Sequence, residues 1–452
     1  MKIKRQIILF FMPLAMLVAS CTFTSCQPDE PQVSDLKKAL QSMELISAIE
    51  ANPDTAAARM KAEGLFDYKE QYSMFFTQDL NHEDEGGESF QQRVCILFRG
   101  FDRPTVLVSE GYDWSDFRDG ADLALNLGAN MIHVEHRNYG QSYNSDLGQW
   151  QYQTVAQASA DLHAVYETFK PLFKGKWLCS GTSKSGEGSI TYAYFYPNDM
   201  DLAVGFCAPF VLGLDDPRFG DYLFNVCGSA YERELMKTGL GNFLQDGEDG
   251  FYREVCDIAR EELDQEPNFS EYVFNLFDTY FQVFQSYSVN EDRTQLLEEM
   301  ATDDEVLLSE LCYVFSENRD DAYRAYFVEL AKEMGWQDNG YSYMADMLTG
   351  TSFDKDDVLT QTLKEEDRWV IGSYDGTVYQ DIVNGFFMNS TCPLLLFYVK
   401  DDPWSGGIPE RVGPNAKVII NPIGIHSPFI NDPVYCPESV KQEVMDYVHK
   451  FI

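Results

Sequence analysis

The stretch KWLCSGTSKSGEGS (Lys176–Ser189) decides how this chain is expected to fold. It opens with a short apolar run that lacks alternation, which is typical of a strand buried on both faces. Small residues then flank Ser183 in the order Gly181, any residue, Ser183, any residue, Ser185, and the sequence GSITYAYFY follows. This order is typical of a nucleophile elbow, in which a strained strand-to-helix turn leaves no room for bulky neighbours of the nucleophile.

Short apolar runs on both sides of this stretch predict further buried strands. They are TVLVS (105–109), NMIHVE (130–135), LAVGFC (202–207), PLLLFYV (393–399) and KVIIN (417–421). Residues 154–170 carry apolar residues at three- and four-residue intervals, as a helix does. Strands that alternate with helices indicate an α/β class with a mostly parallel sheet. Upstream, residues 72–100 predict a hairpin around an acidic Gly-Gly turn, and residues 34–70 predict irregular helix.

A helical segment interrupts the alternation between residues 213 and 382. Between Gly241 and Val370 it holds 32 acidic and 9 basic residues, a net charge of 9 − 32 = −23. TDDEVLLSELCYVF predicts a helix that a Thr302–Glu305 capping box opens and that buries Leu308, Leu311 and Phe315. The sequence therefore predicts a mostly parallel α/β domain with a large helical insertion. The domain comprises residues 35–212 and 383–452, and the acidic insertion comprises residues 213–382.

The first residues have the features of a secretory signal. Lys2, Lys4 and Arg5 precede the 13-residue apolar run 7–19, which is too short to span a bilayer comfortably. VASC (18–21) resembles the lipobox of bacterial lipoproteins. This resemblance implies a signal peptide at 1–20, a lipidated Cys21 and a polar tether at 21–34, with Cys26 as the alternative. We therefore expect an exported protein, lipid-anchored to a bacterial cell-envelope membrane at the periplasm or cell surface.

Composition limits the classes of partner. The chain holds 34 Lys and Arg against 73 Asp and Glu, a net charge of −39, so nucleic acid is not an expected partner. No CxxC or Cys/His spacing suggests a metal, and neither a metal nor a cofactor is expected. Three of the eight remaining cysteines, Cys95, Cys179 and Cys207, lie in apolar strand-like runs and are interpreted as buried thiols. The sequence leaves the disulfide pattern and the oligomeric state open.

A serine nucleophile needs a base, and the base needs an acid that orients it, in the chain order Ser, Asp or Glu, His. Only His426 and His449 follow Ser183. His426 lies in a Gly/Pro loop after a predicted strand, whereas His449 lies in the terminal helix, so His426 is the candidate base. Asp401 and Asp402 end the preceding strand and are the candidate acids.

The oxyanion of the reaction would be stabilised by backbone amides. The amide after the nucleophile belongs to Lys184, and the loop after TVLVS offers the amide of Gly111 or Tyr112. The Lys184 side chain is not expected to act as the base, because adjacent residues on this turn point apart.

Six motifs occur in the order FQQRV (90–94), SEGY (109–112), VEHRNYGQS (134–142), QASAD (157–161), GTSKSG (181–186) and DDPWSGG (401–407). They resemble the secreted tripeptidyl aminopeptidases of the α/β-hydrolase serine peptidases and, more distantly, the prolyl carboxypeptidase and dipeptidyl peptidase family. The resemblance implies an α/β-hydrolase fold in which the acidic insertion at 213–382 is a helical cap over the catalytic pocket. It also implies Ser183 as nucleophile, Lys184 as an oxyanion donor and His426 as base. Asp402 would be the acid, since an aspartate directly precedes PWS in the prolyl carboxypeptidase relatives. Departures are Ser185, where the family usually has glycine, and GIHS around the histidine.

The expected function is an exopeptidase that releases short peptides, three residues long by the resemblance, from free N-termini. Glu110 and Glu135 are candidate anchors for the substrate ammonium, with a structural Glu135–Arg137 ion pair as the alternative for Glu135. An esterase or lipase on the same residues is a second hypothesis. A non-catalytic lipoprotein that binds peptides or glycans is a third.

Overall fold

The computed structural model describes residues 34–51, 68–84, 86–113, 120–142, 150–263, 266–288, 292–317, 323–427 and 429–452. The predicted signal peptide, Cys21, Cys26 and all of the tether but Ser34 lie outside these residues. The chain divides into two units, 1–43 and 44–452. The described part of the first is the short helix α1 (Asp35–Gln41), where the Ser34 hydroxyl accepts a hydrogen bond from the Lys37 amide. Over the described ranges, no helix has both the length and the apolar character that a membrane crossing requires.

The second unit is built on one nine-stranded sheet with the order β1-β2-β3-β5-β4-β6-β7-β8-β9. Pairing is antiparallel from β1 to β5 and parallel from there to β9. The strands are β1 (Ile46–Ala51), β2 (Glu70–Asp79), β3 (Ser89–Phe98), β4 (Thr105–Ser109), β5 (Asn130–Val134), β6 (Trp177–Thr182), β7 (Leu202–Phe206), β8 (Leu394–Val399) and β9 (Ala416–Asn421). The predicted hairpin and all six predicted buried runs are confirmed as strands.

The expectation of helix over residues 34–70 is wrong for β1. Residues 46–51 pair antiparallel with β2, Ile46 opposite Phe76 and Ala51 opposite Tyr72, with an irregularity between Ser47 and Glu50. The sequence ISAIEA contains Ala and Glu, which are poor strand formers, so local propensity does not reveal this strand. Its pairing with the long edge of β2 decides its conformation.

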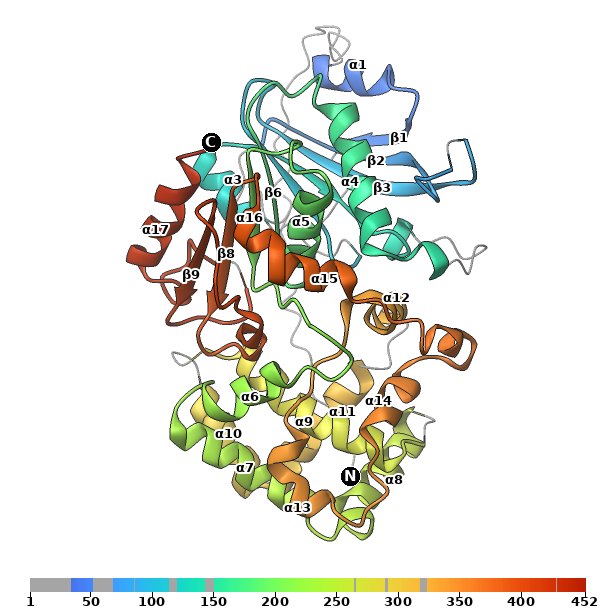
Figure 1. Ribbon diagram of the computed structural model, residues 1–452, viewed down its shortest axis with the longest axis vertical. Coiled ribbons are helices and arrows are strands. Elements are labelled where there is room, and N and C mark those ends of the chain that lie inside the picture. The colour runs from blue at the N-terminus through green and yellow to red at the C-terminus, as the bar shows by residue number, and fades with distance from the viewer. Residues whose placement is uncertain are drawn as a thin grey trace, which may run out of the picture. The chain divides into compact units, whose positions relative to one another are not determined.

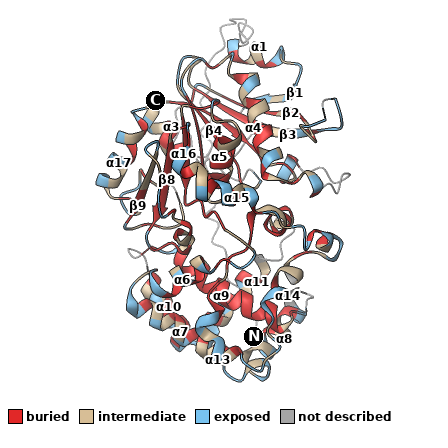
Figure 2. Ribbon diagram, viewed as in Figure 1, coloured by how far each residue is buried: buried red, intermediate tan, exposed pale blue. Residues whose placement is uncertain are grey.

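Helices cover both faces of the sheet, as Figure 1 shows. Apolar residues of α3 (Ala121–Leu127) and α17 (Glu438–Val448) join one core cluster with alternate residues of β4 to β8. On the opposite face lie α4 (Val155–Phe169) and α5 (Lys184–Phe195), where a Cβ on Gly205 of β7 would come within 3.1 Å of Ile190. The parallel strands β4 to β8 are therefore buried on both sides (Figure 2), which explains why their sequences show no alternation. The expected burial is wrong for β9, because this strand lies at the edge of the sheet and its Ile420 is 49% exposed.

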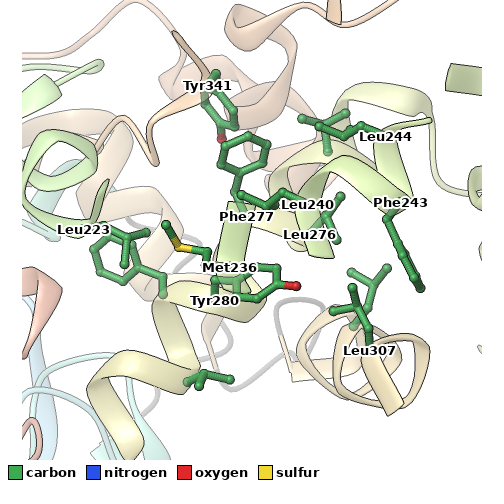
Figure 3. Packing of buried hydrophobic residues seen from close by; sticks show 14 of the residues in the cluster. Leu223, Met236, Leu240, Phe243, Leu244, Leu276, Phe277, Tyr280, Leu307 and Tyr341 are labelled. Atoms are coloured by element: carbon green, nitrogen blue, oxygen red, sulfur yellow. The ribbon is translucent and has the colours of Figure 1, made fainter. Parts of the chain in front are cut away.

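A run of helices lies between β7 and β8, and all of them but α16 fall within the predicted cap at 213–382. They are α6 (Pro217–Asn225), α7 (Ala230–Leu244), α8 (Phe251–Leu263), α9 (Phe269–Ser286), α10 (Arg293–Thr302), α11 (Asp304–Glu317), α12 (Arg324–Glu329), α13 (Ala345–Leu348), α14 (Lys355–Thr362), α15 (Thr377–Asp381) and α16 (Phe387–Asn389). Helices α6 to α11 and α13 enclose a hydrophobic core of their own (Figure 3). Helix α9 is buried along most of its length. Gly239 of α7 packs so closely on it that a Cβ would lie 1.9 Å from the Tyr280 hydroxyl.

The predicted capping box at Thr302 is wrong. Thr302 ends α10, and its hydroxyl donates to the Glu298 carbonyl at 2.7 Å. Asp303 instead accepts from the Glu305 amide at 3.1 Å, so α11 begins one residue later than expected. Leu311 and Phe315 are buried as predicted, but Leu308 is only partly buried. The sequence pattern at Thr302 is misleading because α10 and α11 follow each other almost without a linker.

Candidate active site

Ser183 lies on a sharp turn between β6 and α5. Its backbone has φ 57° and ψ −127°, a conformation that is strained for a residue with a Cβ. The Ser183 amide donates to the carbonyl of Phe206 at 2.8 Å, and the Ser183 carbonyl accepts from the Glu187 amide at 2.9 Å. The turn is therefore held by β7 on one side and by the first turn of α5 on the other. This is the geometry of a nucleophile elbow.

Small residues around Ser183 are required by close packing. A Cβ on Gly181 would lie 2.0 Å from the Ser185 hydroxyl, and one on Gly186 would lie 2.9 Å from the Phe206 carbonyl. Ser185, the position noted above as a departure from glycine, donates its hydroxyl hydrogen to the carbonyl of Ser109 at the end of β4. The serine therefore fits the elbow and ties it to the neighbouring strand.

His426 and Asp402 meet beyond the ends of β9 and β8. The Nδ1 atom of His426 lies 2.6 Å from a carboxylate oxygen of Asp402, which is fully buried. Because an ionised carboxylate only accepts hydrogen bonds, this contact assigns the proton to Nδ1 and leaves Nε2 with its lone pair. Nε2 is buried and has no hydrogen-bond partner among the described residues. An imidazole held in this tautomer can take a proton from a nearby hydroxyl.

Asp401 and Asp402 have different partners. The second oxygen of Asp402 accepts from the Trp404 amide at 3.1 Å, whereas Asp401 lies 3.1 Å from the buried guanidinium of Arg293 in the cap. Asp401 also accepts from the Gly228 amide at 3.2 Å. The other candidate base, His449, is exposed at the C-terminal end of α17. The structure thus brings Asp402, and not Asp401, to His426.

The loop that carries Asp402 packs against the cap. Asp402 opens the short 3₁₀ helix Pro403–Gly407. A Cβ on Gly406 in this turn would lie 2.6 Å from the carbonyl of Arg218 in α6. Gln285 of α9 accepts from the His426 amide at 2.8 Å through its backbone and from the Trp404 indole at 2.6 Å through its side chain. Contacts from α6 and α9 therefore hold both loops that meet at the imidazole.

Ser183 and His426 line one cavity of about 270 Å³ between the sheet and the cap. The cap side of this cavity is rich in aromatic and amide side chains. They include Phe274, Gln282, Gln285, Tyr313, Tyr323, Tyr326 and Trp336. Asp278 of α9 is a buried carboxylate of the same wall. A cavity with apolar walls and a few polar groups is typical of a site for a small organic ligand or a short peptide.

The Lys184 side chain is buried and tied to two groups. Its ammonium donates to the carbonyl of Gly111 at 2.6 Å and lies 2.9 Å from the carboxylate of Glu329 in α12. Burial lowers the pKa of Lys184, although Glu329 opposes this effect. The ammonium is thus engaged away from the Ser183 hydroxyl, and it fastens the loop after β4 to the elbow.

The candidate oxyanion donors lie around the same turn. Lys184 is the first residue of α5, so its amide is one of the amides that a helix leaves without an internal partner. Gly111 packs directly on the elbow, since a Cβ there would lie 2.8 Å from the Ser185 amide nitrogen. Tyr112 lines the cavity with Ser183. Two chain segments with backbone amides therefore meet at the turn that carries Ser183.

Glu110 and Glu135 are both buried but are not among the residues that line the cavity. The carboxylate of Glu110 lies 2.5 Å from His133. That of Glu135 accepts from the amide and hydroxyl of Ser142 at 2.8 and 2.7 Å and lies 3.9 Å from Arg93. The structure therefore does not bring either candidate anchor to Ser183.

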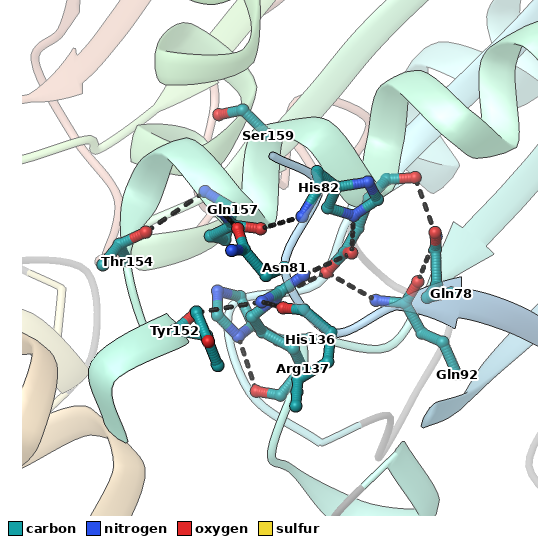
Figure 4. A network of polar contacts seen from close by, with 12 residues as sticks. Gln78, Asn81, His82, Gln92, His136, Arg137, Tyr152, Thr154, Gln157 and Ser159 are labelled. Carbon is teal, nitrogen blue, oxygen red and sulfur yellow. Dashed lines mark hydrogen bonds and ion pairs between the residues drawn. The ribbon is translucent and has the colours of Figure 1, made fainter. Parts of the chain in front are cut away.

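The alternative pairing of Glu135 with Arg137 is also corrected. Arg137 forms two hydrogen bonds with Asp161, at 2.7 and 2.6 Å. His82 lies 2.8 Å from Asp161, and Gln92 donates to the Glu135 carbonyl at 2.9 Å. Figure 4 shows His82, Gln92 and Arg137 close together in this network. The motifs FQQRV, VEHRNYGQS and QASAD therefore converge in one buried polar network that braces the sheet. These motif residues support the fold and lie away from the cavity.

Sequence reasoning missed two carboxylates near the elbow. Glu329, the ion-pair partner of Lys184, comes from the acidic cap, where no local pattern separates it from its many acidic neighbours. Glu187 lies within the opening stretch itself, four residues after Ser183. Burial raises the pKa of Glu187 to about 8, against the opposing charge of Lys184. The position of Glu187 could have indicated its place in the site, because residues four apart lie on one face of a helix.

Two groups of three side chains within the described ranges have potential metal-ligating atoms within 4.8 Å of one another. One is Cys207 with Asp402 and His426, and the other is His163 with Glu167 and Asp199. In both, the histidine already contacts an aspartate directly, at 2.6 and 2.7 Å. The hydrogen bond from His426 to Asp402 gives the imidazole its orientation without an ion.

The strand order, the elbow after β6 and the positions of Asp402 and His426 after β8 and β9 are those of the α/β-hydrolase fold. This confirms the predicted fold class. Solved structures align only distantly. VinJ is 12% identical, with 84% of this chain and 99% of VinJ covered and a TM-score of 0.42. Proline iminopeptidase of Mycobacterium smegmatis is 12% identical, with coverages of 83% and 98% and a TM-score of 0.38.

Sequence comparison is more specific. The prolyl tri/tetrapeptidyl aminopeptidase of Streptomyces mobaraensis is 30% identical over 163 residues, which cover 36% of this chain and 34% of the relative, about a third of its length. The PS-10 peptidase S37 family matches residues 29–263, just over half of the chain. This region contains Ser183, while Asp402 and His426 lie beyond it. The chain therefore belongs to the PS-10 peptidase S37 family.

Proposed function

We propose that this protein is a serine exopeptidase that releases short peptides, of about three residues, from substrates with a free N-terminus. Ser183 is the nucleophile, His426 the general base and acid, and Asp402 the residue that orients the imidazole. The observation that carries the proposal is the shared cavity: Ser183 and His426 line the same space, and Nε2 of His426 has no hydrogen-bond partner among the described residues. Membership of a peptidase family and the activity named for the Streptomyces relative support a peptide substrate.

The reaction follows from the groups around the elbow. The Ser183 oxygen attacks the scissile carbonyl carbon while its proton passes to Nε2 of His426. The negative charge on the carbonyl oxygen is stabilised by the amide of Lys184 and an amide of Gly111 or Tyr112. His426 then gives the proton to the leaving amine, and an acyl-enzyme on Ser183 remains. Water, activated by the same imidazole, hydrolyses this ester and restores the serine.

The test is a panel of dipeptide and tripeptide anilides, each with a free and an acetylated amino end, given to wild type, Ser183→Ala and Ser427→Ala. Ser427 adjoins His426 in sequence and serves as the matched control. Turnover of free-ended peptides that is lost in Ser183→Ala and kept in Ser427→Ala supports the proposal. Turnover of carboxylic esters with no peptide cleaved would favour an esterase, and turnover of neither would favour a binding protein.

We also propose that the protein is exported and lipid-anchored through Cys21. The support is the basic start, the apolar run 7–19 and the VASC sequence that precedes the polar tether. Growth with an alkyne-tagged fatty acid should label the wild-type protein and not a Cys21→Ala variant, while Cys26→Ala stays labelled. Label that persists in Cys21→Ala and disappears in Cys26→Ala would move the anchor to the second cysteine. Absence of label in the wild type would contradict lipidation.

A further inference from the structure

Glu187 faces a small recess beside the nucleophile. The recess, of about 10 Å³, is lined by Ser183, Lys184 and Glu187 together with Tyr326 and Trp404. Ser183, Tyr326 and Trp404 also line the main cavity, so the recess is a side branch of it. Such a space holds one group of the size of a water molecule or an ammonium.

The Glu187 carboxylate is buried and incompletely paired. The side chain is 2% exposed, and its Oε2 atom has no hydrogen-bond partner among the described residues. On an α-helix, side chains lean toward the N-terminus, so Glu187 on α5 points back toward the end of the helix that carries Ser183. A buried carboxylate oxygen without a donor is unfavourable unless a ligand supplies one.

The Lys184 ammonium does not serve as the hydrogen-bond partner of Oε2 of Glu187. The Lys184 ammonium is shared between the Gly111 carbonyl and the Glu329 carboxylate. Burial raises the pKa of Glu187 to about 8, with Lys184 and a hydrogen bond from Tyr379 opposing and Glu329 adding to the increase. The remaining walls are mostly apolar and include Val211 and Leu330. An arriving ammonium would therefore meet Glu187 in a site from which bulk water is largely excluded, and its positive charge would favour the ionised form of the Glu187 carboxyl group.

We propose that Glu187 is the specificity-determining residue that binds a primary ammonium group of the substrate. The inference rests on the proposed peptidase function and deepens it. Two sources share this chemistry: the α-ammonium of the substrate N-terminus, and the side-chain ammonium of a lysine next to the scissile bond. Either would form a charge-assisted hydrogen bond with Oε2 while the scissile carbonyl lies at Ser183. Glu110 and Glu135, the earlier candidates, already receive contacts from the protein.

The test starts from the anilide that the wild type cleaves fastest. Four derivatives combine a free or acetylated amino end with lysine or norleucine before the scissile bond. They are given to wild type, Glu187→Gln, Glu187→Asp and Asp278→Asn, the last a matched carboxylate change in the same cavity. The rate of labelling by a small uncharged fluorophosphonate reports on Ser183 and His426 independently of the anchor.

In Glu187→Gln we expect kcat/KM for substrates with the recognised ammonium to fall roughly 10- to 100-fold, mainly through KM. Substrates without it should change little, labelling should be kept, and Glu187→Asp should recover part of the loss. A loss that follows the free amino end assigns the α-ammonium, and one that follows lysine assigns the side chain.

Equal effects of Glu187→Gln on all four substrates, or a selective loss only in Asp278→Asn, would overturn the anchor while the peptidase function stands. A wild type that cleaves no peptide yet reacts with the fluorophosphonate would overturn the proposed function and the anchor with it.

Discussion

The ammonium of Lys184 lies 2.9 Å from the carboxylate of Glu329, and both side chains are buried. Lys184 follows the nucleophile directly, and Glu329 ends cap helix α12, so this ion pair joins the elbow to the cap. His136 lies 3.5 Å from the other carboxylate oxygen of Glu329. The lysine of the GTSKSG motif thus acts as a structural link through its side chain, while its backbone amide remains at the N-terminus of α5.

Breaking this ion pair should destabilise the protein. Glu329→Gln leaves the buried Lys184 ammonium without its counter-charge. The free energy of unfolding should therefore fall by about 3 kcal/mol. The double variant Lys184→Met, Glu329→Gln should lose less than the sum of the two single changes, because neither charge is then left unpaired. Urea denaturation of the four proteins measures the coupling. Strict additivity would contradict a direct interaction.

The two neighbouring aspartates should differ in function. Asp402→Asn removes the acceptor that fixes the His426 tautomer, so kcat should fall by about 10⁴ with little change in folding. Asp401→Asn should keep most of the activity but lower the melting temperature, because the buried Arg293 guanidinium then lacks one of its carboxylate partners. Steady-state kinetics and thermal unfolding of both variants separate the roles. The opposite ranking of kcat would reassign the orienting acid to Asp401.

The cap should be sensitive to acid through Glu232. Burial alone would raise the pKa of Glu232, but hydrogen bonds from Arg293 and Ser229 and the charge of Arg293 lower it from 4.5 to about 2. A folded-state pKa below the unfolded value stabilises the protein above about pH 4.5, and this contribution is lost as the pH falls toward 2. Glu232→Gln should therefore be less stable than wild type at pH 6, and the gap should narrow by pH 3. If urea titrations show the same difference in stability between wild type and Glu232→Gln at every pH, the lowered pKa of Glu232 is contradicted.

Glu187 should have the opposite pH dependence. Its folded-state pKa of about 8 lies above the unfolded value of 4.5, so its contribution to stability is complete below about pH 4.5 and is lost as the pH rises through 8. The groups that act on it are Lys184, Glu329 and Tyr379. Relative to wild type, Glu187→Gln should gain stability between pH 5 and pH 9. Melting temperatures that run in parallel over this range would show that Glu187 ionises normally.

The sequence predicted the parts of the site that are set by local pattern and sheet geometry. The carboxyl ends of parallel strands meet at one edge, so a serine after β6, an aspartate after β8 and a histidine after β9 had to lie near one another. It did not predict the contacts of Arg293, Glu329 or Arg137, since each pairs with a residue distant in sequence. The strand β1 was missed for the same reason: its partner β2, and not its own composition, determines its conformation.

The most direct test of the central claim is the location of a covalent adduct. A fluorophosphonate should modify the wild-type protein once, and mass spectrometry of its peptides should place the adduct on Ser183. A cleavable free-ended peptide in excess should slow the modification, and Ser183→Ala and His426→Gln should show almost none. An adduct on another residue, or an unmodified wild type that still cleaves peptides, would contradict the assignment of Ser183 as the nucleophile.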